Sequence, residues 1–133
     1  MKVLVGVVSL LAVLPWSSGK TYRMTADRSV PAATGTVQVQ RDKANGNMKL
    51  DIKVNHLANP ATLTPPGSTY IVWVRPNGGE AMKQGAIGVD KNLKGELKVA
   101  TTSKDFDIFI TVEESDIVTA PSGIEVLKVH ISP

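Results

Sequence analysis

The sequence contains no cysteine and few aromatic side chains. Its 133 residues include two Trp, two Tyr, two Phe and two His. Without cysteine the chain cannot form a disulfide, a thiolate metal site or a lipid anchor attached through a thiol. Blue copper needs a Cys and two His, and catalytic zinc usually takes three strong ligands, so His56 and His130 alone cannot build either site. We expect both histidines at the surface, no metal or cofactor, and a fold stabilised by burial alone.

An excess of charge of one sign is also missing. The 15 basic and 12 acidic residues leave a formal net charge of +3. The basic residues are spaced singly along the chain, and few aromatic side chains lie between them on which bases could stack. This pattern is typical of solvated strand faces. We therefore expect no nucleic-acid partner.

Motifs of known catalytic sites are absent as well. The sequence has no Gly-x-Ser-x-Gly elbow and no glycine-rich phosphate loop. Its one dense group of charges is acidic: Asp105, Asp107, Glu113, Glu114 and Asp116. The first three are evenly spaced, which places them on one side of a strand, and we expect that side to be exposed. The sequence thus favours a non-enzymatic protein, with a metal-dependent hydrolase using these acids as the weaker alternative.

The N-terminus has the plan of a secretory signal peptide. Lys2 supplies a positive charge, Val3–Trp16 is apolar, and small residues end the segment at Gly19. We predict cleavage between Gly19 and Lys20, which leaves residues 20–133 as a single secreted or periplasmic domain without a stable membrane span. As a helix the apolar stretch would reach about 21 Å, short of a bilayer core of about 30 Å, so a retained anchor is the weaker alternative.

What the rest of the chain does contain is a series of short strand patterns separated by Gly, Pro and Asn. The clearest is Thr69–Arg75, an unbroken aromatic and β-branched run predicted to be a central strand beside or across from Phe106–Glu113. Residues 57–68 are rich in proline and are predicted to cross between sheets, whereas residues 20–28 form a polar lead-in. The remaining predicted strands are 34–40, 48–55, 80–90, 96–100 and 124–131. About eight strands favour an all-β, immunoglobulin-like antiparallel β-sandwich, with a closed β-barrel as the alternative.

Trp73, in the predicted central strand, has two interpretations. In a sandwich, a Trp on a central strand most often fills the space between the two sheets. Alternatively it is exposed and forms a binding face with Ile71, Arg75 and Phe109, because aromatic and Arg side chains are typical anchors of protein interfaces. The candidate binding residues are therefore Trp73, Arg75 and Phe109.

Several short motifs in the second half of the chain occur together in a known family. They are Tyr70-Ile-Val-Trp73, Gly78-Gly79, Gly85, the Thr-Val-Glu that ends at Glu113, and Pro121-Ser-Gly123. From Tyr70 to Gly123 the chain resembles the extracytoplasmic domain of anti-sigma-K factors. The resemblance implies a β-sandwich outer domain used without the family's cytoplasmic sigma-binding segment and membrane helix.

These observations together predict an exported module that binds or senses an envelope protein or ligand. A structural subunit that pairs through its sheet edges is the second possibility. The metal-dependent hydrolase is the third.

Overall fold

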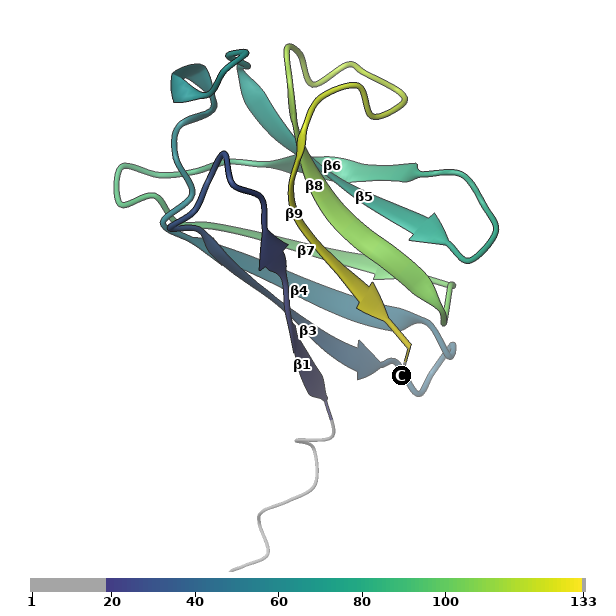
Figure 1. The fold of residues 1–133 in the computed structure, drawn as a ribbon. Helices are drawn as coiled ribbons and strands as arrows, with labels where there is room; N and C mark the ends of the chain where they lie inside the picture. Colours follow the sequence, from purple (N-terminus) through teal and green to yellow (C-terminus); the bar gives the residue numbers. More distant parts are fainter. Residues whose placement is uncertain (1–18, 133) are drawn as a thin grey trace, which may run out of the picture.

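The protein is an antiparallel β-sandwich, shown by a computed structural model that describes residues 19–132 (Figure 1). A four-stranded sheet has the order β1-β3-β4-β7, and a five-stranded sheet has the order β2-β9-β8-β5-β6. The strands are β1 (Lys20–Arg23), β2 (Thr25–Ala26), β3 (Thr34–Arg41), β4 (Met48–Asn55), β5 (Thr69–Pro76), β6 (Met82–Ile87), β7 (Gly95–Thr101), β8 (Phe106–Glu113) and β9 (Glu125–Ile131). The predicted all-β sandwich is confirmed, and the barrel alternative is wrong because the two sheets remain separate.

The predicted signal segment, including the apolar stretch Val3–Trp16, lies outside the described residues except for Gly19. Within residues 19–132, no helix is long and apolar enough to cross a bilayer. Among residues 19–132, the buried hydrophobic side chains extend from Met24 to Ile131, so this core of the sandwich is formed within the part of the chain that begins at Lys20.

Alternation of apolar and polar residues fixes the registers of the sheets. In β4, Met48 and Ile52 point into the core and are at most 3% exposed, while Lys49 and Lys53 point to solvent. A register shift of one residue would bury the lysines, so the pairing is strongly determined. In β5 both faces are buried, which explains the unbroken apolar run in the sequence. Of the two predicted arrangements for these strands, side by side or across from each other, the structure has the first: β5 lies beside β8, with Tyr70 opposite Val112.

The N-terminal segment is not a polar lead-in, and that prediction is wrong. β1 pairs with β3 of one sheet, and β2 pairs with β9 of the other, so the segment passes from sheet to sheet. Met24 at the crossing is buried, and its N–H donates to the Gly35 carbonyl (2.8 Å). β1 has only four residues, so few side chains turn inward and its apolar pattern is weak; Tyr22 and Met24 carry it.

Residues 57–68 connect β4 in one sheet to β5 in the other, as predicted, through the 3-10 turn η2 (Pro60–Thr62). The Tyr70 hydroxyl donates to the Ala58 carbonyl, and burial raises the pKa of Tyr70 to about 12. The pairing of the next strand, β6, with β5 is irregular. The β5–β6 register shifts between Val72 and Trp73, and Gly85 has a φ of 150°.

The turns and loops of the sandwich lie at two opposite ends, which we call the basal end and the apical end. The basal end holds the start of β1, the turn between β3 and β4, and the loop between β7 and β8, and the end of β9 lies there too (Figure 1). The apical end holds η2, the loop between β6 and β7, and the loop between β8 and β9. The open edges of the two sheets are at β6 and β7 on one side, and at β1 and β2 on the other.

Candidate functional site

The predicted binding residues lie on the outer face of the five-stranded sheet, but not as an exposed aromatic patch. Trp73 is fully buried and Phe109 is 1% exposed, and with Ile71 they form a cluster separate from the core between the sheets. Ala81, before β6, and Val118, in the loop after β8, pack against this cluster. Both interpretations of Trp73 are therefore wrong in their details. It neither fills the space between the sheets nor reaches solvent, because the loops cover it.

A chain of hydrogen bonds connects Trp73 to the apical loop between β8 and β9. Trp73 Nε1 donates to Thr111 Oγ1 (2.8 Å), whose hydroxyl donates to Glu113 Oε2 (2.6 Å). The same carboxylate accepts the Ser122 hydroxyl (2.6 Å) and the N–H groups of Ser122 (3.0 Å) and Gly123 (3.2 Å). We call these five residues the Glu113 latch. Through them the loop is held against the strand that carries Trp73.

Glu113 is only 2% exposed, so the prediction of an exposed acid is wrong at this position. The physical reason is that its carboxylate is fully supplied with donors, which is the condition under which a charge can be buried. Burial by itself would raise the pKa of Glu113, but the hydrogen bonds from Ser122, Thr111 and Gly123 outweigh it and hold the pKa below its usual value of 4.5. The group is therefore ionised at neutral pH.

Beside the latch, the outer face of the sheet is hollowed into a pocket of about 380 Å³, which we call the outer-face pocket. It is lined by Thr25, Arg75, Asp107, Phe109, Glu125, Lys128, Val129 and His130. The guanidinium carbon of Arg75 lies 4.5 Å from the centre of the Phe109 ring, which is cation–π distance. Arg75 Nε lies 3.7 Å from Asp107 Oδ2. Two of the three candidate residues, Arg75 and Phe109, thus meet in this pocket, and Trp73 lies opposite Phe109 in the ladder.

His130 is held between two carboxylates at the basal side of the pocket. Its Nδ1 is hydrogen-bonded to Asp107 Oδ1 at 2.7 Å, and its Nε2 makes an ion pair with Asp105 Oδ1, also at 2.7 Å. The hydrogen bond to Asp107, supported by Asp105, raises the pKa of His130 above 6.5 although partial desolvation opposes it. Because both ring nitrogens face carboxylates, neither is free to accept a proton from a substrate or to bind a metal.

The structure divides the acidic group seen in the sequence. Asp105 and Asp107 meet His130, whereas Glu113 and Glu114 lie at the other end of β8 with Asp116 in the following loop. In the part of the chain that the structure describes, no three His, Asp or Glu side chains are arranged to hold a metal ion. His130 and His56 are both exposed, as predicted. The contact between Asp107 and His130 was not foreseen, because it requires the register of β8 against β9.

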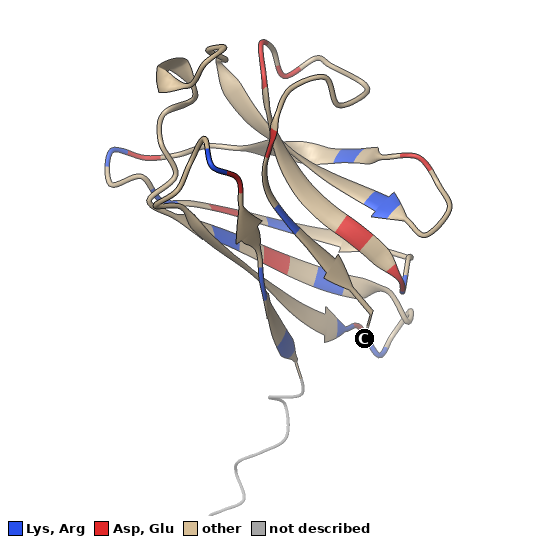
Figure 2. Cartoon of the chain, viewed as in Figure 1, with Lys and Arg blue, Asp and Glu red and all other residues tan. Residues whose placement is uncertain are grey.

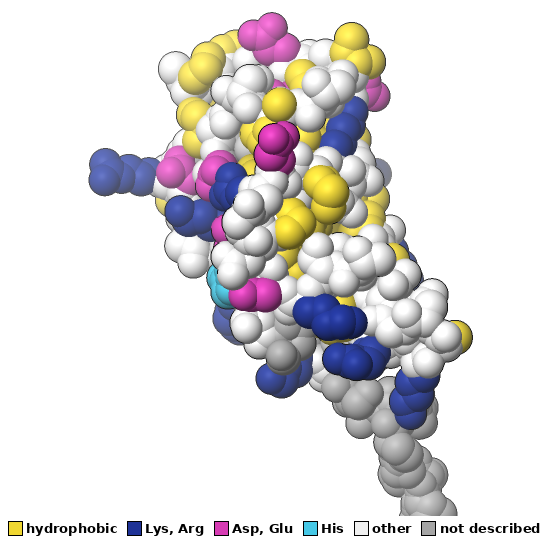
Figure 3. All heavy atoms as spheres, turned by 90° about the vertical axis from the view of Figure 1, so that its right-hand side faces the viewer, with side chains coloured by type: hydrophobic (Ala, Val, Ile, Leu, Met, Phe, Trp, Pro, Cys, Tyr) yellow, Lys and Arg dark blue, Asp and Glu magenta, His cyan; other side chains and the backbone are white. Residues whose placement is uncertain are grey.

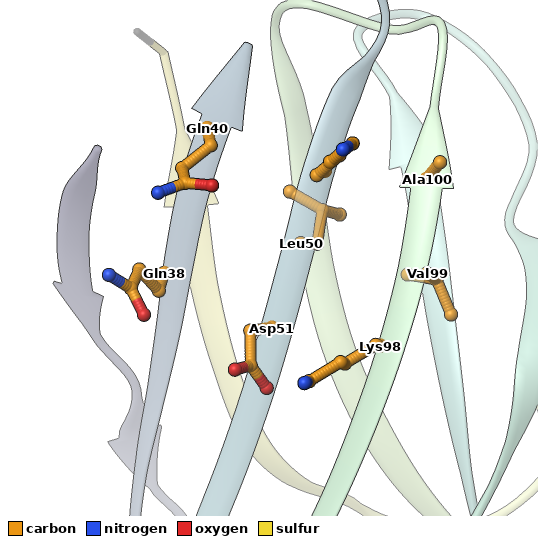
Figure 4. Close-up of a pocket in the computed structure, with 8 residues that line it drawn as sticks. Gln38, Gln40, Leu50, Asp51, Lys98, Val99 and Ala100 are labelled. Carbon is orange, nitrogen blue, oxygen red and sulfur yellow. The ribbon is translucent and has the colours of Figure 1, made fainter. Parts of the chain in front are cut away.

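A second hollow, of about 480 Å³, lies on the outer face of the four-stranded sheet (Figure 4). Its outward side chains are polar, among them Gln38, Gln40, Asp51 and Lys98 from three neighbouring strands. Asp51 and Lys98 are opposite each other in the β4–β7 ladder. With no aromatic or large apolar side chain pointing outward, this face has the character of a solvated sheet surface, and the outer-face pocket is the better candidate.

No family model fits the chain, and no curated protein is significantly similar to it. The fold and the outer-face pocket therefore define the class of protein. It is an antiparallel β-sandwich with a charged and aromatic pocket on one sheet.

Proposed function

We propose that the protein is an exported, non-enzymatic module that binds a protein partner in the cell envelope through the outer-face pocket. The observation that carries the proposal is Arg75 stacked on Phe109 and tied to Asp107. Arg and aromatic side chains are the commonest anchors of protein interfaces, and an Arg held in place beforehand loses less conformational freedom when a partner binds. The Arg75 side chain remains 40% exposed, so its charge is accessible to a partner.

The state of His130 supports binding over catalysis. A general base needs a free nitrogen directed at its substrate, but both nitrogens of His130 are engaged by Asp105 and Asp107. These contacts instead hold the His130 side chain in one orientation at the edge of the outer-face pocket. The pocket also combines Arg75 and Lys128 with acidic groups, a mixture that suits a polar peptide surface better than a fully apolar ligand.

The resemblance to the outer domain of anti-sigma-K factors supports a sensing role. Three of the motifs that carry it meet in the Glu113 latch, because Trp73, Glu113 and the Ser122-Gly123 pair are joined by hydrogen bonds. The latch supports Phe109 from the neighbouring strand, since Trp73 is its partner in the ladder. In this proposal the shared motifs maintain the platform, and the pocket residues choose the partner.

The experiment is a comparative cross-linking capture from envelope extracts, followed by reconstitution with the purified partner. The protein, Arg75→Ala and the matched control Lys91→Ala at the apical end are compared at several salt concentrations. We expect one partner to be captured by the protein and by Lys91→Ala, and to be lost with Arg75→Ala. Equal capture by both variants, or no capture at any salt concentration, would contradict the proposal.

Pairing through sheet edges remains the second candidate function. At the open edge of β6, however, the bulge beside Trp73 and the exposed Lys83 interrupt the flat row of groups that another strand would need. Size-exclusion chromatography with light scattering separates the two functions, and we expect a monomer.

A further inference from the structure

Basic side chains that are scattered in the sequence come together at the basal end of the sandwich. We call this group the basal rim, and it consists of Lys20, Arg41, Lys43, Lys49 and Lys104, all of them exposed. They come from the start of β1, the β3–β4 hairpin and the loop between β7 and β8. Figure 2 shows a blue segment at the start of β1 and further ones to its right, in the β3–β4 hairpin and the loop between β7 and β8, and Figure 3 shows several Lys and Arg side chains at the lower end of the molecule.

The positive charge of the basal rim is neutralised only in part. Asp42, the acid within the hairpin, accepts the Ala44 N–H at Oδ1 (2.9 Å) and makes one long ion pair, between its Oδ2 and Lys49 Nζ at 3.9 Å. Asp105, the nearest acid of the adjacent loop, is paired with His130. The apical end, in contrast, mixes both signs, with Asp90, Lys91, Lys94, Glu114 and Asp116 in its loops. The three segments that form the basal rim therefore carry five basic side chains against two acids, Asp42 and Asp105, and keep a net positive charge.

The basal rim is also a fixed surface. Lys104 Nζ donates to the Gly46 carbonyl (2.9 Å), which ties the loop between β7 and β8 to the β3–β4 turn. Within that turn, the Gly46 N–H donates to the Asp42 carbonyl (2.7 Å). A preformed arrangement of charges loses little freedom when it docks on a flat charged surface.

We propose that the basal rim docks on an anionic phospholipid bilayer. Lys20 enters the rim directly after the sequence segment that contains the apolar stretch Val3–Trp16. Where that stretch is kept as an anchor, the basal rim is the end of the sandwich that lies next to the bilayer. Basic groups near an anionic bilayer surface are attracted to its headgroups, each one raising the affinity by a factor of about five.

A bilayer fits this end better than a nucleic acid does. The rim includes no aromatic side chain on which a base could stack, and its charges lie at the end of a sandwich and not along a groove that could follow a phosphate backbone. The docked protein would stand with its strands pointing away from the bilayer. The outer-face pocket on the side of the sandwich would then stay open to a partner.

The test is co-sedimentation with phosphatidylcholine vesicles that do or do not contain phosphatidylglycerol, using the chain that begins at Lys20. We expect binding only to vesicles with the anionic lipid, and weaker binding as salt is raised. The double variant Arg41→Glu/Lys43→Glu should bind at least about 25-fold more weakly. The matched control Lys91→Glu/Lys94→Glu changes the net charge equally at the apical end and should bind as the unmodified protein does.

Several results would overturn the proposal. If both double variants weakened vesicle binding equally, the effect would be one of net charge and not of the basal rim. Equal binding to neutral vesicles, or no binding to anionic vesicles, would also contradict it. Tighter binding to a DNA duplex with the same dependence on the rim would assign the surface to nucleic acid instead. Circular dichroism of both double variants confirms that they are folded. Arg75→Ala should bind vesicles normally, so this test and that of the partner-binding function fail independently.

Discussion

Removing the Glu113 carboxylate should destabilise the protein more than removing any exposed acid. In Glu113→Ala the buried Thr111 hydroxyl loses the acceptor to which it donates at 2.6 Å, and the loop loses its bonds from Ser122 and Gly123. In Glu113→Gln the shape is kept. The amide nitrogen can face the Ser122 hydroxyl, which can turn to accept, and the amide oxygen retains the remaining donors.

The expected magnitudes follow from the burial of each donor. A buried donor without a partner costs about 1–3 kcal/mol, and this applies in full to Thr111, which is completely buried. Ser122 and Gly123 are exposed, so water replaces part of what they lose, at roughly 1 kcal/mol for each bond. Ser122 and Gly123 make three such bonds, so we expect Glu113→Ala to lower the free energy of unfolding by about 4–6 kcal/mol, and Glu113→Gln by about 1–2 kcal/mol. Because small domains have about 5–15 kcal/mol in total, the first change is severe.

Urea unfolding followed by tryptophan fluorescence measures these changes. In the chain that begins at Lys20, Trp73 is the sole tryptophan, since the other one is Trp16. Native Trp73 should emit at short wavelength because it is fully buried, and the band should shift to the red on unfolding. A red-shifted native band would contradict the placement of this side chain.

The same latch predicts a dependence on acid pH. The pKa of Glu113 is lower in the folded protein than its usual 4.5, so its stabilising contribution is complete above that value and is lost as pH falls through the folded pKa. The unmodified protein should therefore lose stability below pH 4.5 more steeply than Glu113→Gln does.

The matched control is Glu114→Ala, because Glu114 is the next residue and its side chain is exposed. It should change the free energy of unfolding by less than about 0.5 kcal/mol. If Glu113→Ala were as mild as this control, the latch would contribute nothing to stability, and the reasoning from its hydrogen bonds would be refuted.

Three further predictions test other parts of the account. Gly123→Ala should prevent folding or lower the free energy of unfolding by several kcal/mol, because the added Cβ would lie 1.6 Å from a carbonyl oxygen of β8. The control Gly88→Ala places its Cβ in open space and should be nearly neutral. Equal effects of the two changes would contradict this packing. An NMR titration should give His130 a pKa above 6.5, and this pKa should fall in Asp107→Asn. The contribution of the contact to stability is complete below pH 6.5 and is lost as pH rises through the folded pKa. An unchanged pKa in the variant would exclude the hydrogen bond as the cause of the raised pKa. N-terminal sequencing of the exported protein should begin at Lys20, and an intact apolar segment would show a retained anchor instead.

Much of the fold could be predicted from alternation alone. In β4 the lysines and aliphatic residues leave one acceptable register, and the proline-rich residues 57–68 could not belong to a ladder. The shared aromatic and β-branched character of β5 and β8 predicted that they are neighbours, and the structure shows that they pair in one sheet. Each of these features depends on local sequence, or on an alternating pattern long enough to allow only one strand register.

The parts that could not be predicted depend on contacts between distant segments. A strand that is apolar on both faces gives no sign of which face a given residue joins, so the side on which Trp73 is buried stayed open. Burial of Glu113 depends on the loop that returns Ser122 to it, and the contact of His130 with Asp107 depends on the β8–β9 register. β1 could not be predicted because it has only four residues, of which Tyr22 alone is partly buried.

The way the chain enters the sandwich also determines how the protein would respond to tension. β1 lies antiparallel to β3, with Lys20 opposite Val39 and Arg23 opposite Thr36, and its first residue is at the basal end. A pull on the N-terminus directed out of that end acts along the strand, so the paired residues are loaded in shear and must separate together instead of opening one after another. Any tether at this terminus would therefore be attached in the direction in which the first strand resists extension most strongly.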